Sequence, residues 1–176
     1  MTRRRAQRNP RLELDVQQAI RSRRLPSRAQ VRKWAQAVLE NDARITVRVV
    51  GRAEARNLNR SFRGKDYATN VLTFVMRDSP PYEGDLVLCA PVIAHEARQQ
   101  GKRLLAHYAH LVVHGALHLQ GYDHESNADA QIMETRESRI LTELGYPDPY
   151  GKDEGGRRKA EGRRQKDERA RRNAEG

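Results

Sequence analysis

The sequence has few residues of several kinds, and each scarcity excludes a class of protein. It contains one cysteine, one tryptophan and two phenylalanines in 176 residues, and only 37% of the chain is hydrophobic. A single cysteine, Cys89, excludes an internal disulfide, and its apolar neighbours predict a buried thiol. No apolar run approaches the roughly 18 residues that a bilayer-spanning helix needs. The amino terminus MTRRRAQRNP lacks the apolar stretch of a secretory signal, so we expect a cytoplasmic protein with no membrane association.

Acidic residues are too few to balance the basic ones. The chain has 34 Lys and Arg against 23 Asp and Glu, a formal net charge of +11. Such a surface attracts polyanions, and nucleic acid is the first partner that we expect. We predict a basic amino-terminal arm over 1–11, a domain over 12–150 and a charged tail over 151–176. The tail contains no aromatic or large aliphatic residue, so we expect it to be disordered, with solubility and RNA binding as its two open roles.

Hydrophobic periodicity between residues 12 and 150 predicts an α+β fold, with a small mixed sheet of about four strands and about five helices. Strands are predicted at 12–16, 45–50, 71–76 and 84–90, the first at a sheet edge and the last two as neighbours. Helices are predicted after an N-cap at Ser27, at 53–59, from Pro91 to near Gly101, at 103–120 and at 127–144. Residues 60–69 are predicted to form a loop. The last helix is predicted to bury Ile132, Met133, Ile140 and Leu141 on one side.

Histidines gather in the predicted central helix and just after it. Five of the six fall between His107 and His124, among Leu, Val and Ala. His114 and His118 are four residues apart, so on a helix their rings lie on one face and reach one ion. Gly121 permits a turn that brings His124 toward the same ion. Because a catalytic zinc keeps an open position beside three protein ligands, we predict one Zn²⁺ per chain on His114, His118 and His124.

Other residues compete for roles in this cluster. His110 lies one helical turn before the first ligand but about 12 Å along the axis from His118, at about 1.5 Å per residue, so one ion cannot use both. We expect His110 to support a ligand or to pack, and His107 to lie on the helix surface. Asp123 and Asp85 are candidates to orient ligand rings, with capping as an equal alternative. The alternative for the whole cluster is a buried helix whose imidazoles each need a hydrogen-bond partner.

The spacing of the three histidines equals that of the metzincin proteases, HExxHxxGxxH, with Gly115 in place of the glutamate. In those enzymes the glutamate is the base of peptide hydrolysis, so its absence argues against a metallopeptidase. The sequence therefore predicts a zincin-like metal helix that lacks the proteolytic base.

Several longer motifs surround the metal helix. Residues 114–124 read HGALHLQGYDH, and the chain also contains FRGKD at 62–66, TNVLTF at 69–74 and GDLV at 84–87. With these motifs the chain resembles the YbeY family of bacterial zinc-dependent endoribonucleases over approximately residues 45–150. Thr73 and Val75 stand where the family usually has serine and proline, and neither is a predicted ligand.

The resemblance implies an activity, its residues and its partners. It implies that the three histidines bind zinc, that Arg63 is functionally important and that the enzyme cleaves single-stranded RNA. It further implies maturation of the 3′ end of 16S ribosomal RNA, ribosome quality control, and contact with the small ribosomal subunit. A small-subunit ribosomal protein or an assembly GTPase is a further implied partner.

The predicted catalytic residues are Arg63 and His114, with Arg63 neutralising charge that develops on the phosphate. Without the resemblance, a surface salt bridge would be the ordinary role of Arg63. The attacking group, water or the 2′-hydroxyl of the RNA, stays open. The alternative function is a non-catalytic, zinc-containing ribosome-assembly protein that binds RNA.

Overall fold

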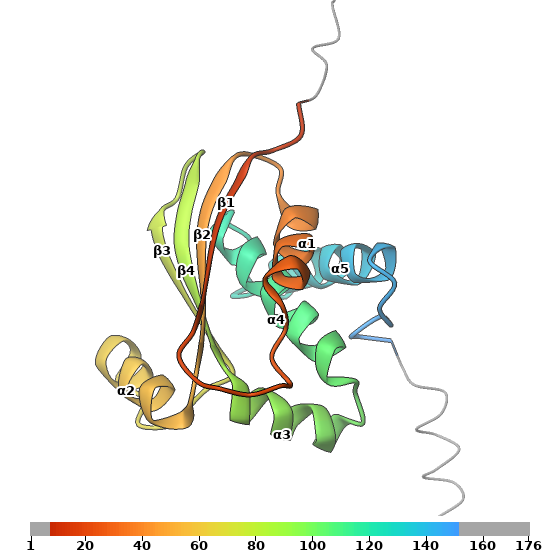
Figure 1. The fold of residues 1–176 in the computed structure, drawn as a ribbon. Coiled ribbons are helices and arrows are strands. Elements are labelled where there is room, and N and C mark those ends of the chain that lie inside the picture. Colours follow the sequence, from red (N-terminus) through yellow and green to blue (C-terminus); the bar gives the residue numbers. More distant parts are fainter. Residues whose placement is uncertain (1–7, 152–176) are drawn as a thin grey trace, which may run out of the picture.

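Four strands form one mixed sheet in the computed structural model, which describes residues 8–151 (Figure 1). The sheet order is β1-β2-β4-β3, and the strands are β1 (Leu12–Gln18), β2 (Ala43–Val50), β3 (Val71–Arg77) and β4 (Tyr82–Cys89). β2 pairs in parallel with β1 and β4, whereas β3 runs antiparallel to β4. The predicted edge position of the first strand and the pairing of the last two are confirmed.

Five helices accompany the sheet in the described part of the chain. They are α1 (Arg28–Val38), α2 (Arg52–Arg63), α3 (Ala90–Gln100), α4 (Leu104–Leu119) and α5 (Asn127–Glu143). The predicted α+β class is confirmed, as is the N-cap at Ser27, whose side chain accepts the backbone N–H of Gln30 at 3.2 Å. Within residues 8–151, no helix has the length and apolarity to cross a membrane. Most of the predicted arm (1–11) and tail (151–176) lies at 1–7 and 152–176, outside the described residues, so these predictions stay untested.

Two details of the predicted elements are wrong. The segment predicted as a loop from residue 60 begins as helix, because α2 continues through Arg63 and ends only where Gly64 takes a left-handed φ of 67°. Arginine favours helix and glycine favours this termination, so the local composition extends the helix by one turn. On α5, Ile132 is 58% exposed, whereas Met133 and Leu141 are buried. Ile132 lies beyond the edge of the face that α4 covers.

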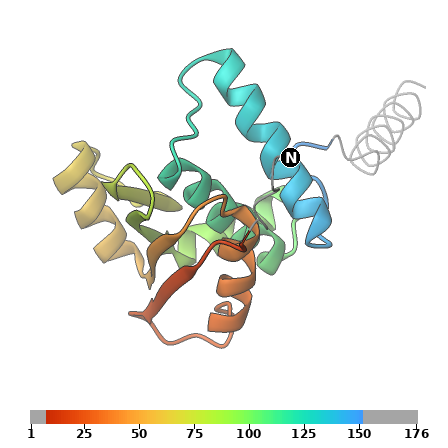
Figure 2. The same ribbon diagram turned by 90° about the horizontal axis from the view of Figure 1, so that it is seen from above.

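Helices cover both faces of the sheet (Figures 1 and 2). Side chains alternate along β2 and β4, so one face contributes to a large core with α1, α4 and α5, and the other contributes to a small core with α2. The large core takes Val47, Val49, Leu86 and Leu88 from these strands; the small core takes Val50, Val87 and Cys89. The predicted burial of Cys89 is confirmed.

The helix α4 is central, as predicted. It packs on β3 and β4 and also contacts α1, α3 and α5. It lies close to the sheet at Gly115, where an added Cβ would lie 2.6 Å from Leu86 Cδ2 and 3.3 Å from Thr73 Oγ1. A larger residue at this position therefore has to displace the buried side chain of Leu86. This packing is a physical reason for the absence of the metzincin base.

Candidate metal centre

Three histidine rings meet at the carboxyl-terminal end of α4. The Nε2 atoms of His114 and His118 are 3.1 Å apart, and the ring centroid of His124 lies 5.7 and 4.9 Å from those of His114 and His118. One ligand nitrogen from each residue lies within 4.8 Å of the other two. A tetrahedral zinc with Zn–N distances of 2.0–2.1 Å separates its ligand nitrogens by about 3.3 Å. The three rings thus fit one ion after small side-chain movements.

The turn after α4 returns His124 to the helix. Its backbone forms a Schellman motif, in which the N–H of Tyr122 donates to the carbonyl of Leu117 at 3.2 Å and the N–H of Gly121 donates to that of His118 at 3.0 Å. Gly121 has a φ of 91°, a conformation that glycine adopts readily. The predicted turn at Gly121 is confirmed.

Tyr122 fastens this turn to α5 and to the segment after α1. Its hydroxyl donates to Glu40 Oε1 at 3.0 Å, and the guanidinium of Arg136 lies 5.2 Å from the centre of its ring. Arg136 also forms an ion pair with Glu40. Two side chains from separate segments, Glu40 and Arg136, therefore anchor Tyr122, which lies two positions before the exposed His124.

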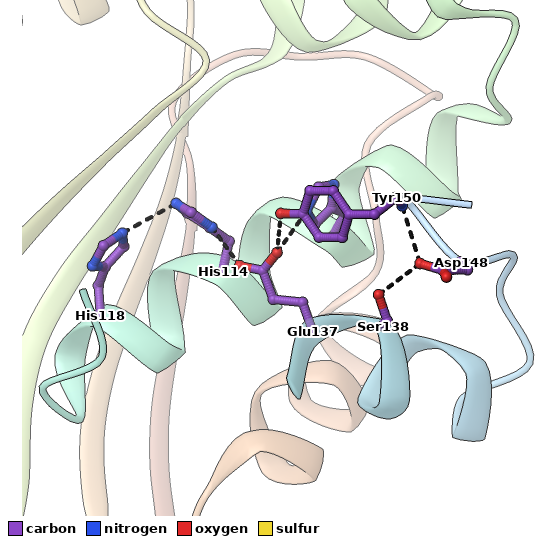
Figure 3. Close-up of polar contacts among 7 residues, drawn as sticks. His114, His118, Glu137, Ser138, Asp148 and Tyr150 are labelled. Carbon is purple, nitrogen blue, oxygen red and sulfur yellow. Dashed lines mark hydrogen bonds and ion pairs between the residues drawn. The ribbon is translucent and has the colours of Figure 1, made fainter. Parts of the chain in front are cut away.

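A buried carboxylate that the sequence analysis did not identify holds His114. Glu137 of α5 is 0% exposed, and its Oε1 lies 2.5 Å from Nδ1 of His114 (Figure 3). Its Oε2 accepts hydrogen bonds from Nε2 of His110, at 3.1 Å, and from the hydroxyl of Tyr150. Because an ionised carboxylate only accepts hydrogen bonds, Nδ1 of His114 carries the proton and Nε2 keeps its lone pair. That lone pair faces His118.

Two pKa shifts favour the protonation states that a metal centre needs. Burial alone would raise the pKa of Glu137, but hydrogen bonds from His110 and His114 outweigh it and lower the pKa to about 2. Glu137 is therefore ionised at neutral pH. Burial lowers the pKa of His118, and the adjacent His114 and His124 lower it further. Neutral imidazole, the form that binds metals, is thus favoured at His118.

A second group of ligand atoms lies beside the first. His110, His114 and Glu137 also bring one donor atom each within 4.8 Å of one another. However, the 2.5 Å between Nδ1 of His114 and the carboxylate is a hydrogen-bond distance, shorter than the roughly 3 Å between two ligands of one ion. His110 contacts the same carboxylate at 3.1 Å, so it supports Glu137, in line with the supporting role expected for it.

The expectation for His107 is wrong. This residue is 4% exposed, because α3 covers this end of α4, and its Nε2 lies 2.8 Å from Glu96 Oε2. Glu96 also accepts the side-chain amide of Asn70 at 3.1 Å. Burial lowers the pKa of His107 despite the neighbouring carboxylate. The network joins α3, α4 and the start of β3.

The two aspartates considered for ring orientation have other surroundings. Asp123 Oδ1 accepts the backbone N–H of its neighbour His124 at 2.7 Å, which is a turn-stabilising contact. Asp85 shares a face of β4 with Val87 and Cys89, and this face is turned away from α4. Glu137 holds a ligand ring instead. The signal in the sequence was an acidic residue four positions from both Met133 and Leu141, on the apolar side of a helix.

Arg63 lies on the other face of the sheet. It is the exposed last residue of α2, which covers the face opposite α4 (Figures 1 and 2). The structure therefore does not bring Arg63 together with the three histidines. The edge strand β3 lies between them: Thr73 is adjacent to Gly115 of α4, while the next residue, Phe74, contacts Phe62 of α2. A ligand that touches both groups has to pass β3.

The fold and the site together define a class of protein. It is an α+β protein with a three-histidine candidate metal centre on a central helix, held from behind by a buried carboxylate, and with a strongly basic chain. The family model described as Endoribonuclease YbeY matches residues 15–145. The chain belongs to this family, and the resemblance found in the sequence is confirmed.

Individual relatives agree with the family. The Endoribonuclease YbeY of Aromatoleum aromaticum is 60% identical over 143 residues, which cover 80% of this chain and 93% of the relative. The Endoribonuclease YbeY of Nitrosomonas eutropha is 58% identical over 137 residues, or 78% of this chain and 97% of that one. The solution structure of TM1509 from Thermotoga maritima has a TM-score of 0.50 at 24% identity and covers 80% of this chain and 99% of its own. This last likeness concerns the fold alone.

Proposed function

We propose that the protein is a zinc-dependent endoribonuclease that cuts single-stranded RNA at the centre formed by His114, His118 and His124. The observation that carries this proposal is the convergence of three ligand nitrogens within 4.8 Å, on a helix that lies inside the family match. Family membership makes the protein an endoribonuclease, a hydrolase of RNA phosphodiester bonds. The single-strand preference and the identity of the metal are the proposed parts.

The residues divide the chemistry between them. Zinc, when bound, supplies a Lewis acid at the reacting phosphate. Glu137 orients His114 through the ring Nδ1, so that the opposite nitrogen faces the centre. Arg63 donates hydrogen bonds to a phosphate of the RNA strand that crosses β3 and offsets its negative charge. The attacking group is identified by the products, because a 2′,3′-cyclic phosphate indicates the 2′-hydroxyl and a 5′-phosphate indicates water.

The biological setting is proposed from the family and from the charge. A formal net charge of +11 suits a protein that acts on ribosomal RNA in a large polyanionic particle. We assign the activity to residues 12–150 and place it in the cytoplasm, at the 3′ end of 16S ribosomal RNA and in ribosome quality control. The small subunit is the proposed partner, with a small-subunit ribosomal protein or an assembly GTPase as a further contact.

Zinc content and RNA cleavage in the same purified samples test this function. The wild type is expected to hold about one zinc and to cut a single-stranded ribosomal RNA fragment, whereas His118→Ala is expected to lose both. His95→Ala is the matched control, because His95 is exposed on α3 away from the cluster, and it is expected to retain both. Zinc binding without cleavage in the wild type would contradict the proposal and favour a non-catalytic assembly protein. Equal cleavage by His118→Ala would place the activity elsewhere.

A further inference from the structure

Glu137 is the one acidic side chain among residues 8–151 that is fully buried. Three donors surround its two oxygens: His114 at Oε1, and His110 and Tyr150 at Oε2. Burying an ionised carboxylate is costly unless its lone pairs are satisfied, and these three hydrogen bonds offset that cost. The ring it holds most closely belongs to a candidate metal ligand.

The segment after α5 completes this arrangement. It folds back so that Tyr150 reaches Glu137, and the Tyr150 ring meets His110 edge-on, with centroids 5.5 Å apart (Figure 3). Asp148 fixes the fold-back, since its Oδ1 accepts the hydroxyl of Ser138 at 2.6 Å and the backbone N–H of Tyr150 at 3.0 Å. The end of the described chain is thereby connected to the metal centre.

We propose that Glu137 is a positioning residue of the metal centre and that Tyr150 and His110 hold it in place. By accepting the Nδ1 proton of His114, Glu137 selects the tautomer whose Nε2 lone pair faces His118 and His124, and it fixes the ring orientation. This inference rests on the proposed function, because it assumes that His114 binds the metal. Substitution of a residue that supports a metal ligand in this way typically weakens metal binding by about 10- to 100-fold.

The substitution Glu137→Gln separates positioning from packing, because it preserves the size of the side chain. One amide oxygen replaces two carboxylate oxygens, so either His114 loses its acceptor, or His110 and Tyr150 both lose theirs. If the amide NH₂ faces His114, it donates to Nδ1, and the ring proton moves to Nε2. A protonated Nε2 has no lone pair for a metal. Tyr150→Phe removes a single donor and leaves His110 in place, so a smaller effect is expected.

Zinc affinity of the full-length protein, measured by competition with a chromophoric chelator, tests this inference. We expect about 10- to 100-fold weaker binding for Glu137→Gln and less than about 10-fold for Tyr150→Phe. Glu134→Gln is the matched control, since Glu134 is exposed on the same helix, and it is expected to bind as the wild type does. The absorption spectrum of the cobalt-loaded proteins reports ligand geometry independently of activity, and we expect it to change in Glu137→Gln.

The outcomes of this experiment are distinct. Wild-type affinity and spectrum in Glu137→Gln would overturn the positioning role while leaving the proposed function intact. Absence of zinc binding in the wild type would instead overturn the proposed function. If Glu137→Gln fails to fold, Tyr150→Phe decides: a measurable loss of affinity supports the role, and wild-type affinity overturns it.

The second face of the sheet carries an independent observation. Phe62, at the end of α2, is 67% exposed, and its ring is held edge-on by Phe74 with centroids 5.1 Å apart. Arg60, Arg63 and Lys65 lie within three residues of it in the sequence and are exposed. An exposed aromatic ring in a segment rich in cations is the combination that binds bases and phosphates of a single strand. We infer that a base of single-stranded RNA stacks on Phe62.

Binding of a short, single-stranded RNA to the His118→Ala background, in which the substrate should stay intact, tests this surface. Because stacking depends on the ring, Phe62→Ala is expected to weaken binding about 5- to 100-fold, and Phe62→Tyr is expected to retain it. The matched control Ile132→Ala removes an exposed apolar side chain on α5 and should leave RNA affinity unchanged. Equal RNA affinities of Phe62→Ala and the parent protein would overturn the inference.

Discussion

The two faces of the sheet present their polar groups in opposite ways. On the α4 face, Glu137 and His107 are buried and each has a hydrogen-bond partner. On the α2 face, Phe62 and Arg63 are exposed at the end of a helix that carries four arginines. A metal centre needs fixed ring orientations, which burial and hydrogen bonds provide. Recognition of a long, charged strand needs accessible groups instead.

This contrast predicts separable defects. Substitutions on the α4 face should change metal binding, and those on the α2 face should change RNA binding or turnover while the metal stays bound. The edge strand β3 joins the two regions, since Thr73 faces α4 and Phe74 faces α2.

Removal of the third ligand should have the largest effect. His124→Ala is expected to lower RNA cleavage by more than about 100-fold, because residues that only support metal ligands already contribute about 10- to 100-fold. Zinc content should fall with it, whereas RNA affinity should stay close to that of the wild type. Cleavage assays and metal analysis on one preparation check this result, and retained zinc with full activity would remove His124 from the centre.

Loss of the arginine on the opposite face should reduce turnover without releasing zinc. Arg63→Ala is expected to slow cleavage by about 10- to 100-fold, because the variant loses a hydrogen bond to a charged phosphate of the bound strand, worth about 1.5–3 kcal/mol. Arg63→Lys should recover part of this loss, because it restores the charge without the planar fork. Zinc loss in Arg63→Ala would show that the residue is structural and would break the separation of the faces.

The close packing of α4 on the sheet should limit the residue at position 115. Gly115→Ala is expected to lower the free energy of unfolding by about 1–3 kcal/mol, since the new Cβ meets Leu86. Denaturant unfolding measures this change. In the background Leu86→Ala the same substitution should cost less, and equal costs in both backgrounds would contradict the packing argument.

The smallest expected effect concerns pH. Burial keeps the pKa of His107 below its ordinary value of 6.5, so the unfolded chain binds a proton more readily than the folded one. The stability contributed by neutral His107 is complete above pH 6.5 and is lost as the pH falls through the folded-state pKa. His107→Gln keeps a donor for Glu96 but does not titrate. Unfolding of both apo-proteins should diverge below pH 6.5, with the variant less acid-sensitive; parallel pH profiles would contradict the assignment.

Local features of the sequence predicted most elements of the fold. Alternation in ITVRVV, the cap at Ser27 and the glycine at position 121 act within a few residues, so they are visible without a structure. The histidine cluster was predictable for the same reason, because His114 and His118 lie on one helix and a single turn separates them from His124. The family motif added Arg63, which no periodicity indicates.

Contacts between distant segments were not predictable in this way. Glu137 lies 23 positions from His114, and the burial of His107 depends on how α3 packs against α4. The sequence also did not reveal that Arg63 and the histidines lie on opposite faces, because this depends on which side of the sheet each crossing helix covers. An acidic residue on the apolar side of α5 was the available signal.

Anomalous diffraction at the zinc edge, from crystals of the full chain grown with equimolar zinc, tests the central claim most directly. The account predicts one anomalous peak within about 2.0–2.1 Å of a ring nitrogen of each of His114, His118 and His124, with Glu137 still bonded to His114. A peak between His110, His114 and Glu137, or no peak near the three histidines, would contradict it.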